Sequence, residues 1–128
     1  MITLQNRQVQ NLSLEKNHKE KNKDNKVKTN ISSQLFTNVK DNSLFRVRYV
    51  VKITANGYVD VDLSYDFDFK TTDIVDEEFT KSLVVRSEAP SLAYPYIKTY
   101  IESVCQLSGY GTLNLPYADF TKEPLDMK

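Results

Sequence analysis

The sequence contains one cysteine, one histidine and no tryptophan. A single cysteine cannot form a disulfide within the chain. The N-terminus, MITLQNRQVQ, has no basic segment followed by an apolar run, so we do not expect a secretory signal. The expected location is the reducing cytoplasm.

Metal sites and covalent catalysis also lack their usual residues. Cys105 has no histidine near it in the sequence, because His18 lies in a distant lysine-rich segment. A zinc site or a Cys–His pair needs more ligands than these. We therefore expect Cys105 to be a core or interface residue, and we expect no metal, no cofactor and no enzymatic activity.

The chain has no net charge and no long apolar run. Seventeen basic and seventeen acidic residues cancel, which gives no overall attraction to nucleic acid or to a membrane surface. No window approaches the roughly 20 apolar residues that span a bilayer. The charges are unevenly placed, with six lysines in 16–28 and eight acidic residues in 60–78. A charged partner protein could therefore bind a local patch.

The length of 128 residues fits one domain, 1–128, with a modest core. The alternation of apolar and polar residues predicts β-strands, and the segments that show it are 2–15, 29–40, 44–55 and 58–69. In the first segment the parity of the apolar positions changes near Val9, which predicts a β-bulge. The Lys/Asn-rich segment 16–28 is expected to be a loop, and 121–128 a short tail.

The last two strands are joined by Asn56-Gly57, a strong hairpin signal. A two-residue loop would pair odd positions with even ones and mix aspartates into the apolar face. A three-residue loop over 55–57 places odd-numbered residues of one strand opposite odd-numbered residues of the other. It requires Gly57 to have a positive φ. That register predicts two cross-strand ion pairs, Lys52 with Asp60 and Arg46 with Asp66.

The segment 70–86 is expected to connect the sheet to a helix, with Asp73 as a possible cap of a short helix over 74–80. Residues 83–85 fit a short strand or a packed linker. A longer helix is predicted from about Leu92 to Leu107, with Gly109 as its C-cap. Pro95 should lie in its first turn or kink it.

This helix carries two apolar stripes. The first consists of Tyr94, Ile97, Ile101, Val104 and Cys105, and the second of Tyr96, Tyr100 and Leu107. Two stripes need two partners, and the simplest pair is the sheet and another subunit. The first stripe is our candidate oligomer interface.

The aspartates of the last strand occupy one of its faces: Asp60, Asp62, Asp66 and Asp68. Their spacing of roughly 7 Å along a strand is too wide for one ion. They fit either a solvated face, with Lys52 and Arg46 as partners, or an acidic surface that docks a basic partner. The candidate docking residues are Asp60, Asp62 and Asp66.

The stretch from Ser87 to Phe120 resembles the C-terminal signature of the SecB-type export chaperones. In that family a helix with an apolar-Pro-Tyr element is followed by a small turn and a Leu-x-Leu-Pro-x-x-x-Phe segment. The matching residues are Ala89, Pro90, Leu92, Pro95, Tyr96, Ile97, Ile101, Gly109, Leu113, Asn114, Leu115, Pro116 and Phe120.

The resemblance implies an α+β fold, with a four-stranded antiparallel sheet and one long helix packed on one face. It also implies a homotetramer built as a dimer of dimers. The implied function is to hold unfolded or precursor polypeptides for export, without ATP, in apolar grooves. Carried over by position, the peptide-binding candidates are Tyr96, Tyr100, Tyr110, Leu113, Leu115 and Tyr117, and the acidic face would meet the translocase motor.

The sequence departs from the family pattern in two places. Lys98 stands where the family usually has arginine, which loses the planar fork of the guanidinium. The sequence stops eight residues after Phe120, without the family's second C-terminal helix and zinc-binding tail. A SecB-like protein dedicated to a single partner, such as an antitoxin, is therefore the alternative function.

Overall fold

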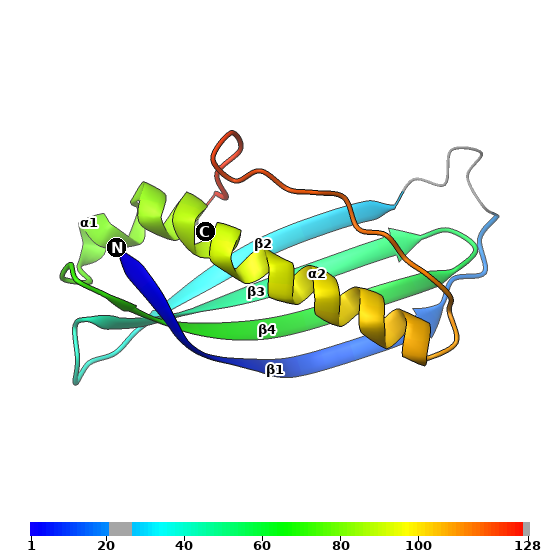
Figure 1. Ribbon diagram of the computed structural model, residues 1–128, viewed down its shortest axis with the longest axis horizontal. Helices are drawn as coiled ribbons and strands as arrows, with labels where there is room; N and C mark the ends of the chain where they lie inside the picture. Colours follow the sequence, from blue (N-terminus) through cyan, green and yellow to red (C-terminus); the bar gives the residue numbers. More distant parts are fainter. Residues whose placement is uncertain (21–26, 127–128) are drawn as a thin grey trace.

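The computed structural model describes residues 1–20 and 27–126. They form a four-stranded antiparallel sheet with one long helix lying across one face (Figure 1). We call the face under the helix the inner face and the opposite one the outer face. The strands are β1 (Ile2–Lys16), β2 (Lys28–Thr37), β3 (Leu44–Ala55) and β4 (Val59–Thr71), in the order β1-β4-β3-β2. The predicted fold class is confirmed.

β1 contains two bulges rather than the single one predicted. Its register against β4 shifts between Leu4 and Asn6 and again between Val9 and Asn11. Each extra residue changes the parity of the strand. The two changes keep Leu4, Val9 and Leu12 packed against the core although their numbers alternate between even and odd.

β3 and β4 supply the centre of the core, as their alternation predicts. Their odd-numbered residues point inward, and among them Tyr49 and Phe67 are almost fully buried. β2 ends earlier than expected, at Thr37, so Val39 lies outside the strand with 98% of its side chain exposed.

The predicted register of the β3–β4 hairpin is wrong by two residues. Ala55 pairs with Val59, so Lys52 faces Asp62 and Arg46 faces Asp68. The predicted Arg46–Asp66 ion pair is still present, with 3.9 Å between Nη1 and Oδ2. The Tyr58 amide donates to the Ala55 carbonyl at 2.9 Å, and Gly57 has a φ of 80°. Both registers place odd residues opposite odd ones, so the hydrophobic pattern could not separate them.

Part of the predicted loop 16–28 is ordered against this hairpin. Asn17 is 4% exposed and donates from Nδ2 to Asp60 at 2.9 Å, while its Oδ1 accepts from the Gly57 amide at 3.3 Å. Residues 21–26 of that loop lie outside the described part of the chain, as do residues 127–128 of the predicted tail.

The connection after β4 is helical where a strand was considered. α1 (Glu77–Thr80) is capped by Asp76, whose carboxylate accepts from the Phe79 amide at 2.8 Å, and not by Asp73. A π-helical turn, η1 (Val84–Glu88), then runs directly into α2 (Ala89–Leu107). The long helix therefore starts earlier than predicted, and Pro95 lies inside it rather than in its first turn.

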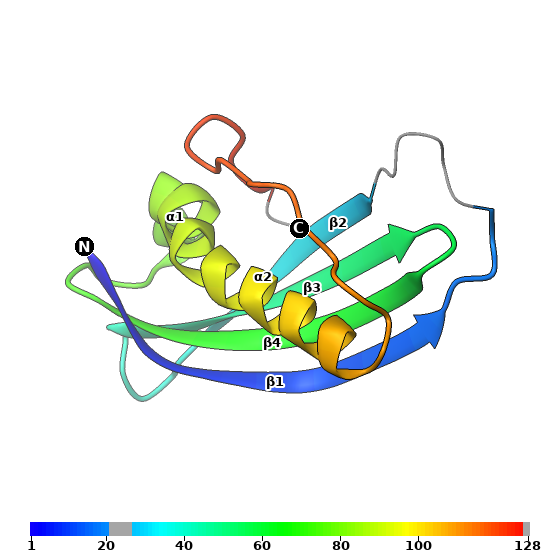
Figure 2. The same cartoon turned by 45° about the vertical axis from the view of Figure 1, so that its right-hand side comes forward.

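The end of α2 forms the predicted glycine cap. The Gly109 amide donates to the Gln106 carbonyl, the Tyr110 amide donates to the Cys105 carbonyl, and Gly109 has a φ of 88°. This pair of bonds is the Schellman arrangement. It reverses the chain into an extended segment, residues 110–126, which we call the strap (Figure 2).

Candidate functional site

The inner face of the sheet is divided by α2, which turns one side toward the core. Ile97, Ile101 and Cys105 are at most 2% exposed. Tyr94 is 6% exposed, and Val104 is half-buried. These residues were predicted to form a subunit interface. Within the chain most of them face the sheet, and their role in a subunit interface stays a prediction.

The strap fills the space on one side of α2. Leu113, Leu115 and Phe120 are 8%, 5% and 6% exposed, and the Phe120 ring packs edge-on against Tyr94 with 5.8 Å between centroids. Both views show the strap running back along the helix over the β2 side of the sheet (Figures 1 and 2). Leu113 and Leu115 thus point into the chain's own core and are not available to a peptide in this arrangement.

A few polar contacts tie the strap to α2. The Tyr94 hydroxyl donates to the Pro116 carbonyl at 2.6 Å, and the Leu115 amide donates to Glu102 Oε2 at 2.8 Å. Lys98 Nζ holds the same carboxylate at 2.9 Å. Burial, and secondarily the nearby charge of Glu102, raises the pKa of Tyr94. The phenol therefore stays a hydrogen-bond donor at neutral pH.

The other side of α2 is partly open and aromatic. Tyr96 is 40% exposed, its ring lies 6.2 Å from Phe67, and the Arg7 guanidinium stands 4.3 Å above it. Tyr100 packs edge-on against Tyr65 at 5.7 Å. We call Arg7, Val9, Tyr96 and Tyr100 the Tyr96 surface.

The structure thus brings together only part of the predicted peptide site. Tyr96 and Tyr100 share the Tyr96 surface. Tyr110 is half-buried against the core, and Tyr117 stands 86% exposed on the strap. Arg7 was not singled out from the sequence, because the first bulge of β1 gives it an inward register that simple alternation does not predict.

The outer face carries the aspartates of β4, and most of them are paired. Asp66 is 2% exposed and accepts from Arg48 Nε at 2.7 Å and Nη2 at 3.0 Å. Asp68 accepts from Arg46 Nε at 2.6 Å and Nη2 at 3.1 Å. Asp60 is half-buried beside Asn17, and Asp62 is exposed. Asp66, one of the three candidate docking residues, is therefore covered and neutralised.

Cys105 lies fully buried on the inward side of α2, and burial raises the pKa of its thiol. A thiol in this setting is a poor nucleophile. Over residues 1–20 and 27–126, no three His, Cys, Asp or Glu side chains gather where they could hold a metal ion.

A family model described as "Preprotein translocase subunit SecB" matches residues 1–122. The chain belongs to the SecB family. This match covers the sheet, α2 and most of the strap, and it agrees with the resemblance found in 87–120.

A similar fold is present in a solved SecB-like chaperone, Rv1957 of Mycobacterium tuberculosis, in complex with a ChAD peptide from the Rv1956 HigA1 antitoxin. The two chains superpose with a TM-score of 0.76 at 14% identity, over 92% of this chain and 90% of the other. At that identity the likeness shows the fold that SecB-like proteins share.

A search of curated proteins finds no match to this sequence. In the described part of the chain, no helix is both long enough and apolar enough to cross a bilayer.

Proposed function

We propose that this SecB-family chain is an ATP-independent holdase that binds unfolded or precursor polypeptides on the Tyr96 surface. The observation that carries the proposal is the exposed Tyr96 ring, held between Phe67 and Arg7 on the open side of α2. Aromatic rings bind apolar side chains of many shapes without a sequence-specific code.

The edge position of β1 supports the same proposal. β1 is an outer strand of the sheet, and Arg7 and Val9 belong to it. An extended polypeptide can add to a sheet edge through main-chain hydrogen bonds while its side chains fill neighbouring pockets. The family's role in protein export, in the cytoplasm, completes the proposal, and docking to the translocase motor would use Asp62 and Asp60 rather than Asp66.

Self-association is part of the proposal, with a different helix face from the one predicted. The solvent side of α2 has no charged residue between Ser91 and Leu107, and it exposes Leu92 and Tyr96 at 40% each and Leu107 at 87%. Thr99, Ser103 and Gln106, which are polar but uncharged, are exposed on the same side. An uncharged helix face with exposed apolar side chains is typical of a surface that another subunit covers. We propose that the contact of a dimer of dimers is centred on Leu92 and Leu107 and leaves Tyr96 open to clients.

The experiment measures whether the purified chain keeps a chemically unfolded test protein from aggregating. Purified chain should delay its aggregation at stoichiometric ratios without ATP, and Tyr96→Ala should weaken binding about tenfold, equivalent to about 1.4 kcal/mol. Tyr117→Ala, on the strap, is the matched variant and should change little. A loss with Tyr117→Ala alone would move the client to the strap side and contradict the proposed surface.

A second function is favoured by one observation. The solved SecB-like chaperone is bound to an antitoxin peptide, and in this chain the strap leaves only one side of α2 open. A protein of this fold dedicated to one partner, such as an antitoxin, fits a short surface. Native pull-down separates the two functions, because a holdase recovers many polypeptides and a dedicated protein recovers one stoichiometric band.

A further inference from the structure

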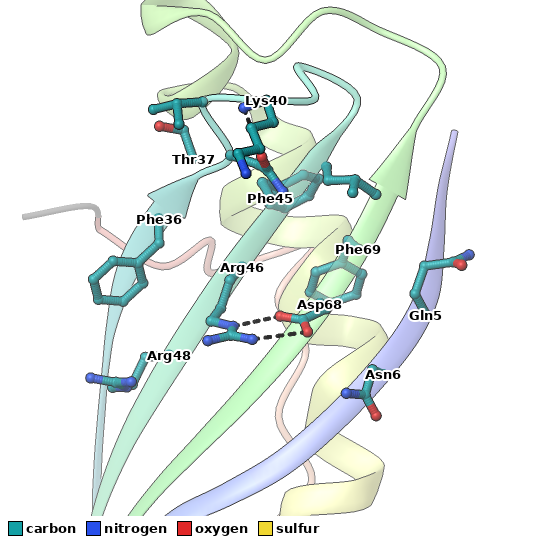
Figure 3. Close-up of a pocket in the computed structure, with 13 residues that line it drawn as sticks. Gln5, Asn6, Phe36, Thr37, Lys40, Phe45, Arg46, Arg48, Asp68 and Phe69 are labelled. Carbon is teal, nitrogen blue, oxygen red and sulfur yellow. Dashed lines mark hydrogen bonds and ion pairs between the residues drawn. The ribbon is translucent and has the colours of Figure 1, made fainter.

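A hollow on the outer face, away from α2 and the strap, lies between β1 and the turn that joins β2 to β3 (Figure 3). Its volume is about 840 Å³. Arg46 and Asp68 form its floor, Phe36 and Lys40 one side, and Gln5 and Asn6 the other. We call it the outer pocket.

The strands around the outer pocket explain its shape. The first bulge of β1 falls at Gln5, and a bulge bends its strand. Figure 1 shows the first residues of β1 turning toward the helix side of the sheet. On the opposite rim, Asn38 Oδ1 accepts from the Lys40 amide at 2.9 Å and the Asp41 amide at 3.1 Å, which fixes the turn.

Two arginines in the outer pocket are held in place from below. Asp66 accepts two hydrogen bonds from Arg48, and Asp68 accepts two from Arg46. These bonds raise the pKa of both guanidinium groups, so both stay charged. A guanidinium has five N–H donors, and each of these pairs uses two. The remaining donors are oriented before any ligand arrives.

An apolar surface adjoins these cations. The Phe36 ring is 42% exposed, with the Arg48 guanidinium 5.2 Å from its centroid. Val39, on the same rim, is 98% exposed. An exposed ring beside fixed cations is suited to a ligand that carries an apolar group next to a negative charge.

We propose that the outer pocket binds an acidic segment of a partner protein in which an apolar or aromatic side chain neighbours a carboxylate. The carboxylate would meet Lys40 and Arg46, and the apolar side chain would lie on Phe36. Charge complementarity selects this ligand, because three cations line the pocket and two carboxylates, Asp66 and Asp68, pair with the arginines, which leaves one positive charge in excess. The site is separate from the inner-face holdase surface and does not depend on it.

Nucleic acid fits the outer pocket less well. A phosphate backbone carries one charge per nucleotide and is bound by neutralising many of them. Here the cations are few, and Asp66 and Asp68 already occupy both guanidinium groups in part. A single carboxylate needs only the donors that remain.

The test uses a short fluorescein-labelled peptide in which glutamates alternate with leucine and phenylalanine, and a control peptide with lysine at each glutamate. Anisotropy should show binding of the first peptide alone, weakened by salt. Phe36→Ser and Lys40→Glu, both at exposed positions, should each raise Kd about fivefold or more. Lys122→Glu, on the strap, makes the same charge change elsewhere and should leave Kd unchanged.

Equal binding of the lysine peptide, or unchanged Kd in Phe36→Ser and Lys40→Glu, would overturn the proposal. Tighter binding of a short RNA, lost in Lys40→Glu, would overturn it in favour of nucleic acid. The holdase assay distinguishes the outer-pocket proposal from the holdase proposal. Both pocket variants should still prevent aggregation of an unfolded client. Tyr96→Ala should lose retention and still bind the glutamate peptide.

Discussion

The Tyr94 hydroxyl lies 2.6 Å from the Pro116 carbonyl oxygen and donates a hydrogen bond to it. This bond joins the first half of α2 to the middle of the strap, 22 residues later in the sequence. The two segments are also joined by the Leu115–Glu102 hydrogen bond and by the packing of Leu113, Leu115 and Phe120. The end of the strap is held by two hydrogen bonds between Arg86 and Leu125.

Tyr94→Phe should lower the free energy of unfolding by about 1 kcal/mol, because one hydrogen bond is lost without a change of shape. Urea titration followed by circular dichroism measures it. Tyr49→Phe is the matched variant. The Tyr49 hydroxyl is buried and has no hydrogen-bond partner among the described residues, so its removal should leave stability equal or raise it. Equal losses in the two variants would contradict the role given to the Tyr94 bond.

Stability should fall at alkaline pH, and Tyr49 should contribute to the fall. Burial raises the pKa of Tyr49 well above its ordinary value of 10.0. Above that ordinary value the unfolded chain loses the phenol proton while the folded chain keeps it, so the unfolding free energy decreases as pH rises. Tyr49→Phe should make the decrease between pH 9 and 11 shallower, measured by urea titrations at each pH. Tyr117→Phe, which removes an exposed phenol, should leave the slope as it is.

Asp66→Ala should destabilise the chain by about 2 kcal/mol. The carboxylate is 2% exposed and holds both N–H groups that Arg48 turns toward it, and bonds to charged groups contribute about 1.5–3 kcal/mol. Asp62→Ala makes the same change at an exposed position of the same strand face. It should cost less than about 1 kcal/mol, because charge interactions at exposed positions contribute little. Thermal melts of both variants give the comparison. Equal decreases in melting temperature would show that the Arg48–Asp66 pair contributes no more to stability than the exposed Asp62 does.

Substitutions in the two faces of α2 should have different effects. Ile101→Asp puts a charge into a fully buried position, so it should unfold the chain rather than dissociate an assembly. Leu92→Asp changes the uncharged solvent side and should yield a folded chain of lower mass by light scattering. An unchanged mass for Leu92→Asp would exclude that face as the subunit contact.

The fold was predictable from the sequence because apolar and polar residues alternate regularly in β3 and β4, and apolar residues recur at helical spacing in α2. The hairpin register was not, since two registers keep the same residues inward and the turn alone selects between them. The partner of the first helical stripe could not be assigned from the sequence for a related reason. A stripe shows that a surface is apolar, but the sheet, a subunit and the strap would all cover it equally well.

The candidate site was predictable in part. Tyr96 and Tyr100 stood out as aromatic residues on one helix face, whereas Arg7 did not, because a bulge changed its direction. Arg48 escaped notice since its partner is set by the register that was predicted incorrectly. Leu113 and Leu115 were recognised as a motif, but a motif does not tell whether its apolar residues bind a client or their own chain.

The two bulges of β1 also limit how another strand can add to its edge. Between and beyond them the regular stretches are Ile2–Leu4, Asn6–Val9 and Asn11–Lys16, of which the last is the longest. A regular strand that pairs along this edge loses register at each bulge. The edge can therefore accept short extended segments, while open-ended strand stacking, the first step toward fibrils, is interrupted at both Gln5 and Gln10.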